Sequence, residues 1–310
     1  MLENLHRSLA ELNRDRLTPG FPTDQCRAEI DREHALRLHE CEVLELERAF
    51  IAERAASAPT DADAFVAWFE ELSKSGPGQN DPLFPWLATK ATAADVCWFL
   101  HQEVAGEAGF EDLVAMTQLR IEGRAKLELA RNYWDEMGRG NASGMHGPML
   151  SRLADALCLQ RFTETVPVVW ESVALGNIML GLAANRRYAY HSIGALGVIE
   201  LTAPWRARHV DDALVRLDLA PNARHYFALH ATLDIKHSAA WNAEVLHPIV
   251  AAEPRAARAI AEGALMRLEA GRRCYARYRA ELGVGTEGTQ PSFARLAQPA
   301  SRNDAPMSMR

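Results

Sequence analysis

The chain has 310 residues, of which 48% are hydrophobic and 24% are charged, and its formal net charge is -7. This length allows one large domain or two ordinary ones, and the modest acidity argues against a nucleic-acid partner, which usually requires a basic stripe. No segment near Met1 resembles a signal peptide, and no apolar run approaches the roughly 20 residues that span a bilayer. We therefore expect a cytoplasmic protein with no membrane partner. Its five scattered cysteines argue against disulfides and a zinc ribbon.

Helical patterns run along the whole chain, and no alternating strand pattern or Gly-rich nucleotide loop interrupts them. The expected helices cover residues 25–54, 61–73, 92–109, 122–137, 149–159, 166–184, 186–202, 222–250 and 255–282. Thr92 and Asp95 are spaced as in a capping box. We predict an all-α multi-helix bundle over residues 81–284. A helical extension at 1–80 would pack on it or pair two subunits as a homodimer, and residues 285–310 read as a disordered tail.

The clearest chemical feature is the trio His230, Asp234 and His237 in the segment HYFALHATLDIKHSAAW. On a helix these positions, i, i+4 and i+7, fall on one face over two turns. Two imidazoles and a carboxylate suit a borderline cation such as Fe(II). The neighbouring residues are largely apolar, so the trio is expected to face inward, where a metal or a full hydrogen-bond network must compensate its burial. The alternative is a solvated face with chance histidines.

A second feature is Glu136 at the end of a helix, followed by His146 after a Gly-rich turn, in NYWDEMGRGNASGMH. The glycines allow the backbone to fold back, so that His146 approaches Glu136. A carboxylate at a helix C-terminus is unfavourable against the helix dipole, and a nearby cation accounts for it better.

Two further carboxylates lie on apolar helices. Glu200 stands in the run GALGVIEL and is either a ligand or paired with Arg206 or Arg208. Glu103 follows the Phe99–Leu100 stripe, with Glu107 as the alternative on the same helix. Glu111 is expected to be a surface or capping group.

These features add up to four carboxylates and three imidazoles, and four negative charges balance two Fe(II) ions. Helical bundles hold such sites between facing helices. The predicted metal ligands are Glu103, Glu136, His146, Glu200, His230, Asp234 and His237.

These residues resemble the haem-oxygenase-like di-iron oxidases and oxygenases, often described as iron-containing redox enzymes. The matching segments are FLHQEVAGEAGFEDLVA, KLELARNYWDEMGRGNASGMH, GALGVIEL and HYFALHATLDIKHSAAW, within about Ala94 to Val250. The resemblance implies a haem oxygenase fold without haem, with Glu136 as the bridging carboxylate.

The implied chemistry uses two iron ions and O2, through a peroxo-bridged di-iron(III) species that oxidises a small amine, amino acid or fatty acid. N-oxygenation of an amine is slightly favoured over C–C cleavage, desaturation or fatty-acid decarboxylation. An external electron donor is expected. Candidate cavity walls are Trp134, Met137, Tyr226 and Trp241.

Three other functions compete with this interpretation. One is a cofactor-free oxidase or a hydrolase on the same fold, the latter requiring a nucleophilic cysteine, for which Cys97 is the nearest candidate. Another is a non-enzymatic helical binding protein, whose polar stripe would be hydrogen-bonded core. A haem-binding protein would need an axial histidine near the chain start, where His34 and His39 lie on a strongly charged helix.

Overall fold

The computed structural model describes residues 2–106, 109–160 and 165–285, and every regular element in them is a helix. The all-α prediction is therefore confirmed. The α-helices are α1 (Leu2–Leu17), α2 (Cys26–Ala55), α3 (Ala62–Ser75), α4 (Leu83–Thr89), α5 (Ala93–Gly106), α6 (Phe110–Thr117), α7 (Gly123–Glu136), α8 (His146–Ala156), α10 (Trp170–Ala184), α11 (Ala189–Arg216), α12 (His225–Trp241), α13 (His247–Ala252) and α14 (Ala256–Leu282). Short 3-10 turns occupy Gly138–Gly140, Ala142–Gly144 and Arg186–Tyr188, and Asn242–Leu246 is a π-helix.

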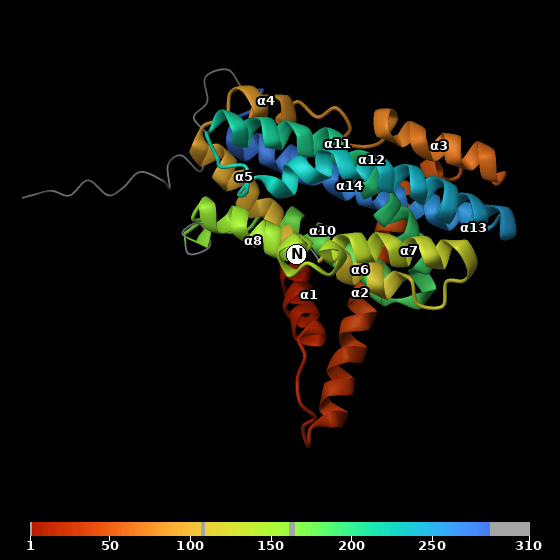
Figure 1. Ribbon diagram of the computed structural model, residues 1–310. Coiled ribbons are helices and arrows are strands. Elements are labelled where there is room, and N and C mark those ends of the chain that lie inside the picture. The colour runs from red at the N-terminus through yellow and green to blue at the C-terminus, as the bar shows by residue number, and fades with distance from the viewer. Residues whose placement is uncertain (1, 107–108, 161–164, 286–310) are drawn as a thin grey trace, which may run out of the picture.

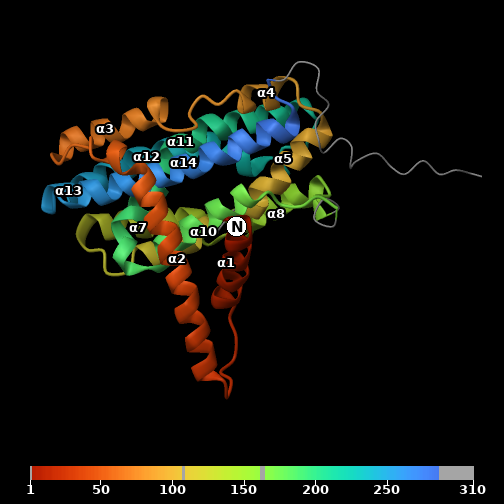
Figure 2. The same ribbon diagram turned by 180° about the vertical axis from the view of Figure 1, so that it is seen from behind.

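The helices form two layers, which both ribbon views show (Figures 1 and 2). One layer contains α11, α12 and α14, with α3, α4 and α13 beside them, and the other contains α6, α7, α8 and α10. Helix α11 packs along both α12 and α14, and α10 connects the layers through contacts with α11 and α14. Buried side chains of the two layers, together with some from α1 and α2, form two large apolar clusters.

Two glycines allow α11 and α14 to approach each other closely. A Cβ atom at Gly194 of α11 would overlap the carbonyl of Ile260, and one at Gly263 of α14 would overlap the carbonyl of His191. Because the interior is close-packed, a larger side chain at either position would push the two helices apart. The glycines therefore fix the position of α11, which carries Glu200.

The N-terminal region is only partly separate from the bundle. Helix α1 and the first half of α2 project together from the layers (Figures 1 and 2). The buried amide of Asn177 on α10 holds α1, because its Nδ2 donates to the carbonyl of His6 at 2.7 Å. The second half of α2 and α3 contribute Leu44, Ile51 and Phe69 to the core of the bundle. A boundary near residue 80 stays a prediction, and the predicted tail from residue 286 onward lies outside the described residues.

The capping box predicted at Thr92 is confirmed, whereas the predicted end of α11 is wrong. The Thr92 backbone N–H donates to Asp95 Oδ2 at 2.8 Å, and the Asp95 N–H donates to the Thr92 hydroxyl at 3.2 Å, which completes the expected capping box. Helix α11 continues beyond the expected end near residue 202 and includes Pro204. Tertiary packing of its second half overrides the helix-breaking tendency of this proline. No helix in the described residues is long and apolar enough to cross a membrane.

Candidate metal centre

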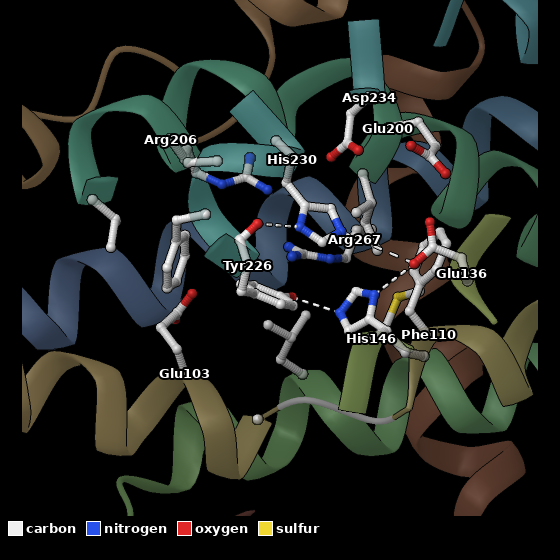
Figure 3. Close-up of a pocket in the computed structure, with 18 of the residues that line it drawn as sticks. Glu103, Phe110, Glu136, His146, Glu200, Arg206, Tyr226, His230, Asp234 and Arg267 are labelled. Carbon is white, nitrogen blue, oxygen red and sulfur yellow. Dashed lines mark hydrogen bonds and ion pairs between the residues drawn. The ribbon is translucent and has the colours of Figure 1, made fainter. Parts of the chain in front are cut away.

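A cavity of about 150 Å³ lies between the two layers and receives side chains from both (Figure 3). Apolar side chains from α4, α5, α10 and α11 form much of its wall. Ionisable groups line the rest, and these are Glu103, Glu136, His146, Glu200, Arg206, Tyr226, His230, Asp234 and Arg267.

Six of the seven predicted ligands are buried close together, and five of these six line the cavity. The sixth, His237, does not line it but lies within 4.0 Å of Glu136, Glu200 and Asp234. Glu136 ends α7 and His146 begins α8, while Glu200 lies within α11. His230, Asp234 and His237 are buried along one face of α12, as the i, i+4, i+7 spacing predicts. The ligands therefore come from four helices that are far apart in the sequence.

The Gly-rich turn after α7 returns the chain as expected. Gly138 has φ +61°, and a Cβ atom there would meet the backbone of Gly144 at 2.5 Å, so the two ends of the turn touch. Only glycine combines this positive φ with so close an approach. As a result, His146 Nδ1 lies 2.6 Å from Glu136 Oε2.

The carboxylate of Glu136 belongs to two potential metal-binding groups. One group joins it to His146 and His230, and the other joins it to Glu200 and His237, with the ligand atoms of each group within 4.8 Å of one another. His237 Nδ1 is 3.7 Å from Glu136 Oε1, while His230 Nε2 is 4.0 Å from Glu136 Oε2. The two oxygens of Glu136 thus face opposite groups, which is the geometry of a carboxylate that can bridge two metal ions.

Each imidazole uses one nitrogen for an outer partner and presents the other to the carboxylates. His230 Nδ1 donates to the backbone carbonyl of Tyr226 at 2.6 Å, and His237 Nε2 donates to Asp135 Oδ2 at 3.2 Å. His146 Nε2 lies 2.6 Å from the Tyr226 hydroxyl. Such outer partners orient metal-binding histidines and fix their tautomers. The inner nitrogens are left to bind metal.

Glu200 is not paired with either arginine considered from the sequence. Its Oε1 accepts a hydrogen bond from Asn132 Nδ2 at 2.6 Å, and its Oε2 lies 3.4 Å from His237 Nδ1. Arg206 instead donates to Thr202, and Arg208 to the carbonyl of Ala231. The amide of Asn132 therefore orients one carboxylate oxygen and leaves the other toward the centre.

Burial and mutual repulsion perturb the protonation of this centre. Burial raises the pKa of Asp234 well above its usual value, and the charge of nearby Glu200 raises it further. Burial acts against the charged forms of Glu136 and His237 as well, but it is outweighed. Contacts with His146 and His230 lower the pKa of Glu136, and Glu200, Glu136 and Asp135 raise the pKa of His237 to about 9.

The donor set fits a cation better than it fits a hydrogen-bond network. His237 Nδ1 and Asp234 Oδ1 are buried, lie 4.0 Å apart and have no hydrogen-bond partner among the described residues. Buried polar atoms normally have partners, and those that do not require an explanation. A metal ion bound by both atoms would supply it, and would also offset the repulsion between Asp234 and Glu200.

Glu103 lies apart from the other predicted ligands. It lines the cavity but belongs to neither donor group, and Figure 3 shows it on the side away from Glu136 and Glu200. Burial raises the pKa of Tyr278, and the negative charge of Glu103 raises it further. Its alternative, Glu107, lies outside the described residues. Glu111, expected to be a surface or capping group, lies in the first turn of α6. One of its carboxylate oxygens is buried, and the other lies beside Gly147, next to His146.

Of the four side chains expected to form the cavity wall, only Tyr226 lines the cavity. Trp134 is 53% exposed, and Trp241 packs against Gly197 of α11. Met137 is also absent from the wall. Helical phase explains the error for Trp134, because it lies two residues from Glu136 and therefore on another face of α7.

Sequence reasoning missed two orienting residues on α7, Asn132 and Asp135. Asn132 precedes Glu136 by four residues and therefore shares its helix face, which is a signal that the sequence contains. Asp135 precedes Glu136 directly, and only the position of α12 brings it to His237.

Comparison with known proteins agrees with this geometry. A family model described as iron-containing redox enzyme matches residues 97–272, which is more than half of the chain and includes all seven predicted ligands. No curated protein matches the chain. From the matched range and the helical fold, we conclude that the chain belongs to the iron-containing redox enzyme family, within the haem-oxygenase-like fold.

Proposed function

We propose that this iron-containing redox enzyme is a non-haem di-iron oxidase or oxygenase, which uses O2 to oxidise a small organic substrate. The observation that carries the proposal is the position of Glu136, whose two oxygens face two separate groups of donors. A site for one metal would need only one of these groups. Two groups that share a carboxylate are suited to a pair of ions.

The residues of the chain have distinct roles in this proposal. Glu136 would bridge the ions, with His146 and His230 on one side and Glu200 and His237 on the other. Asp234 adds a carboxylate beside His237. When bound, two iron ions would supply the redox equivalents and the open coordination positions that O2 chemistry requires.

The surroundings support oxidation of a substrate beside the centre. The cavity touches the inner residues of the cluster, and its other walls are largely apolar. Such walls limit the access of water to the reacting groups. The Tyr226 hydroxyl, 2.6 Å from His146 Nε2, lies at the cavity wall and can hold or move a proton there.

The substrate class proposed from the sequence is an amine, an amino acid or a fatty acid, with N-oxygenation of an amine as the favoured outcome. The proposal includes an external electron donor, a homodimer formed through the N-terminal helices, and a cytoplasmic location. The five free cysteines are consistent with the last of these.

The competing functions have less support. For the hydrolase, burial raises the pKa of Cys97, which disfavours the thiolate that a nucleophile requires, and Cys97 does not line the cavity. A non-enzymatic binding protein with a hydrogen-bonded polar core does not explain why the buried atoms His237 Nδ1 and Asp234 Oδ1 have no hydrogen-bond partner among the described residues. For a haem protein, His34 and His39 are exposed on α2, away from the cavity.

The proposal is tested by adding Fe(II) anaerobically to the metal-free protein, counting bound iron, and then mixing with O2 while recording visible absorption. We expect about two irons per chain and an O2-dependent change in absorption, both lost in His237→Ala. A single iron per chain, or no reaction with O2 from folded protein, would refute the di-iron function.

A further inference from the structure

Two arginines line the same cavity as the metal centre. Arg206 comes from α11, six residues beyond Glu200, and Arg267 comes from α14. In Figure 3 both guanidinium groups lie on the side of Tyr226 and Glu103, away from Glu136 and Glu200. The cavity therefore has an acidic, histidine-rich end and an arginine-rich end.

Neither arginine forms an ion pair with any carboxylate in the described part of the chain. The lack of a carboxylate partner distinguishes Arg267 from other arginines of α14. Arg258 pairs with Glu262 at 2.7 Å, Arg272 with Glu269 at 2.6 Å, and Arg277 with Glu281 at 2.7 Å. A partly buried guanidinium without a counter-ion is unfavourable, so an anion that enters the cavity would be stabilised there.

The fold holds both guanidinium groups in place. Arg206 Nη1 donates to the hydroxyl of Thr202, one turn earlier, at 2.8 Å. Arg267 lies over Gly271, where a Cβ atom would come within 2.8 Å of Nη1. Gly271 thus leaves the space that the guanidinium occupies. Two guanidinium groups held in this way suit the planar, bidentate binding of a carboxylate.

The charges at this end of the cavity favour an anion. Burial raises the pKa of Tyr275. The positive charges of Arg206 and Arg267 lower this pKa, and the negative charge of Glu103 raises it further. All three charges therefore act on one buried hydroxyl. Among the described residues that line this end of the cavity, two positive charges exceed the single negative charge of Glu103.

The rest of the cavity lining is largely apolar. It includes four phenylalanines, Phe84, Phe99, Phe110 and Phe227, and aliphatic side chains such as Leu175 and Ile199. An apolar wall with a few placed polar groups is typical of small-molecule sites.

We propose that the substrate carries a carboxylate, which Arg206 and Arg267 bind, and that its apolar part extends along the phenylalanine wall toward the metal centre. This inference rests on the proposed function for its reaction, but the binding itself does not need iron. It selects amino acids and fatty acids over simple amines. An amino acid would place its ammonium group near Glu103, whereas a fatty acid would not use Glu103.

The test measures binding to metal-free protein, so that a carboxylate cannot bind to iron instead. The ligands are straight-chain monocarboxylates of four to twelve carbons, the amines of matching length, and the proteinogenic amino acids, each followed by calorimetry and thermal shift. We expect a carboxylate from one of the two classes to bind, while the matched amine does not. If only amino acids bind, the substrate is an amino acid. If only the monocarboxylates bind, the substrate is a fatty acid.

Arginine variants then locate the binding. Arg206→Gln and Arg267→Gln are each expected to weaken carboxylate binding about ten- to hundredfold, as for a lost charge-assisted hydrogen bond. Arg277→Gln, on the outer part of α14, is the matched control and should not change it. Gly271→Ala retains every charge but displaces Arg267, so it should also weaken carboxylate binding. It serves as the test if a glutamine variant fails to fold.

Three results would overturn the inference: no carboxylate binds, the amines bind as tightly as the carboxylates, or both arginine variants retain normal carboxylate affinity. Iron uptake separates this inference from the proposed function. Arg206→Gln and Arg267→Gln should still take up iron and react with O2, whereas His237→Ala should lose iron and still bind the carboxylate.

Discussion

In the described part of the bundle, the charges of two buried clusters of carboxylate and histidine are compensated in opposite ways. In one, Glu262 of α14 accepts from Arg48 and His191 at 3.0 Å and pairs with Arg258 at 2.7 Å. In the other, Glu136, Glu200 and Asp234 face three histidines, and no arginine or lysine pairs with these three carboxylates in the described residues.

The difference separates a structural cluster from a candidate metal centre. Glu262 joins α2, α11 and α14 through fixed cations, and these contacts outweigh burial and lower its pKa to about 2. The other cluster has buried donor atoms without partners and a strongly raised pKa at Asp234. A buried acidic group is therefore informative about metal binding mainly when the protein does not supply its own cations.

The largest effect is expected for Glu136→Gln, which removes the shared carboxylate. We expect iron uptake to fall from about two ions per chain to fewer than one, with folding retained, because the substitution also removes a buried charge. Iron analysis and a thermal melt of the metal-free protein measure both quantities. Normal iron content would show that Glu136 is not a bridging ligand.

Glu262→Gln should have the reverse effect. It breaks the ion pairs of Arg48 and Arg258, and we expect the free energy of unfolding to fall by about 3 kcal/mol, with iron uptake unchanged. Chemical denaturation provides the measurement. A stable protein that has lost its iron would reverse the assignment of the two clusters.

The two clusters should also respond to pH in opposite directions. The raised pKa of His237, about 9 against a usual 6.5, gives stability that is present below pH 6.5 and lost as the pH rises through 9. This amounts to at most about 3 kcal/mol. The lowered pKa of Glu262 gives stability that is present above its usual 4.5 and lost as the pH falls toward 2.

Stability curves of metal-free protein test this difference. His237→Asn should flatten the decline on the alkaline side, and Glu262→Gln should flatten it on the acidic side. Equal alkaline curves for wild type and His237→Asn would contradict the pKa assigned to His237.

Asp135→Asn tests the outer layer of the centre. Its carboxylate accepts from His237 Nε2, so we expect iron affinity to fall about ten- to hundredfold, less than in Glu136→Gln. Competition with a chelator measures the affinity. An unchanged value would mean that α12 alone orients His237.

The smallest effect is expected for Trp134→Ala. This side chain is 53% exposed and does not line the cavity, so stability should change by no more than about 0.5 kcal/mol and iron uptake should not change. A loss of iron would show that Trp134 contributes to the site, as the sequence predicted.

Local geometry explains what the sequence by itself determined. Helical periodicity specified the all-α class, the capping box at Thr92 and the shared face of His230, Asp234 and His237, because each depends on residues within about two turns. The glycines after α7 likewise indicated the return of His146 toward Glu136.

The tertiary structure decided the rest, since it depends on contacts between helices far apart in sequence. Packing of α7, α8, α11 and α12 gave Glu136 its two groups of donors, and left Glu103 on the other side of the cavity. The same packing selected which nitrogen of each imidazole faces inward, and brought Arg206 and Arg267 to one cavity from α11 and α14. Periodicity specifies a face of a helix, but only the assembled bundle determines what that face meets.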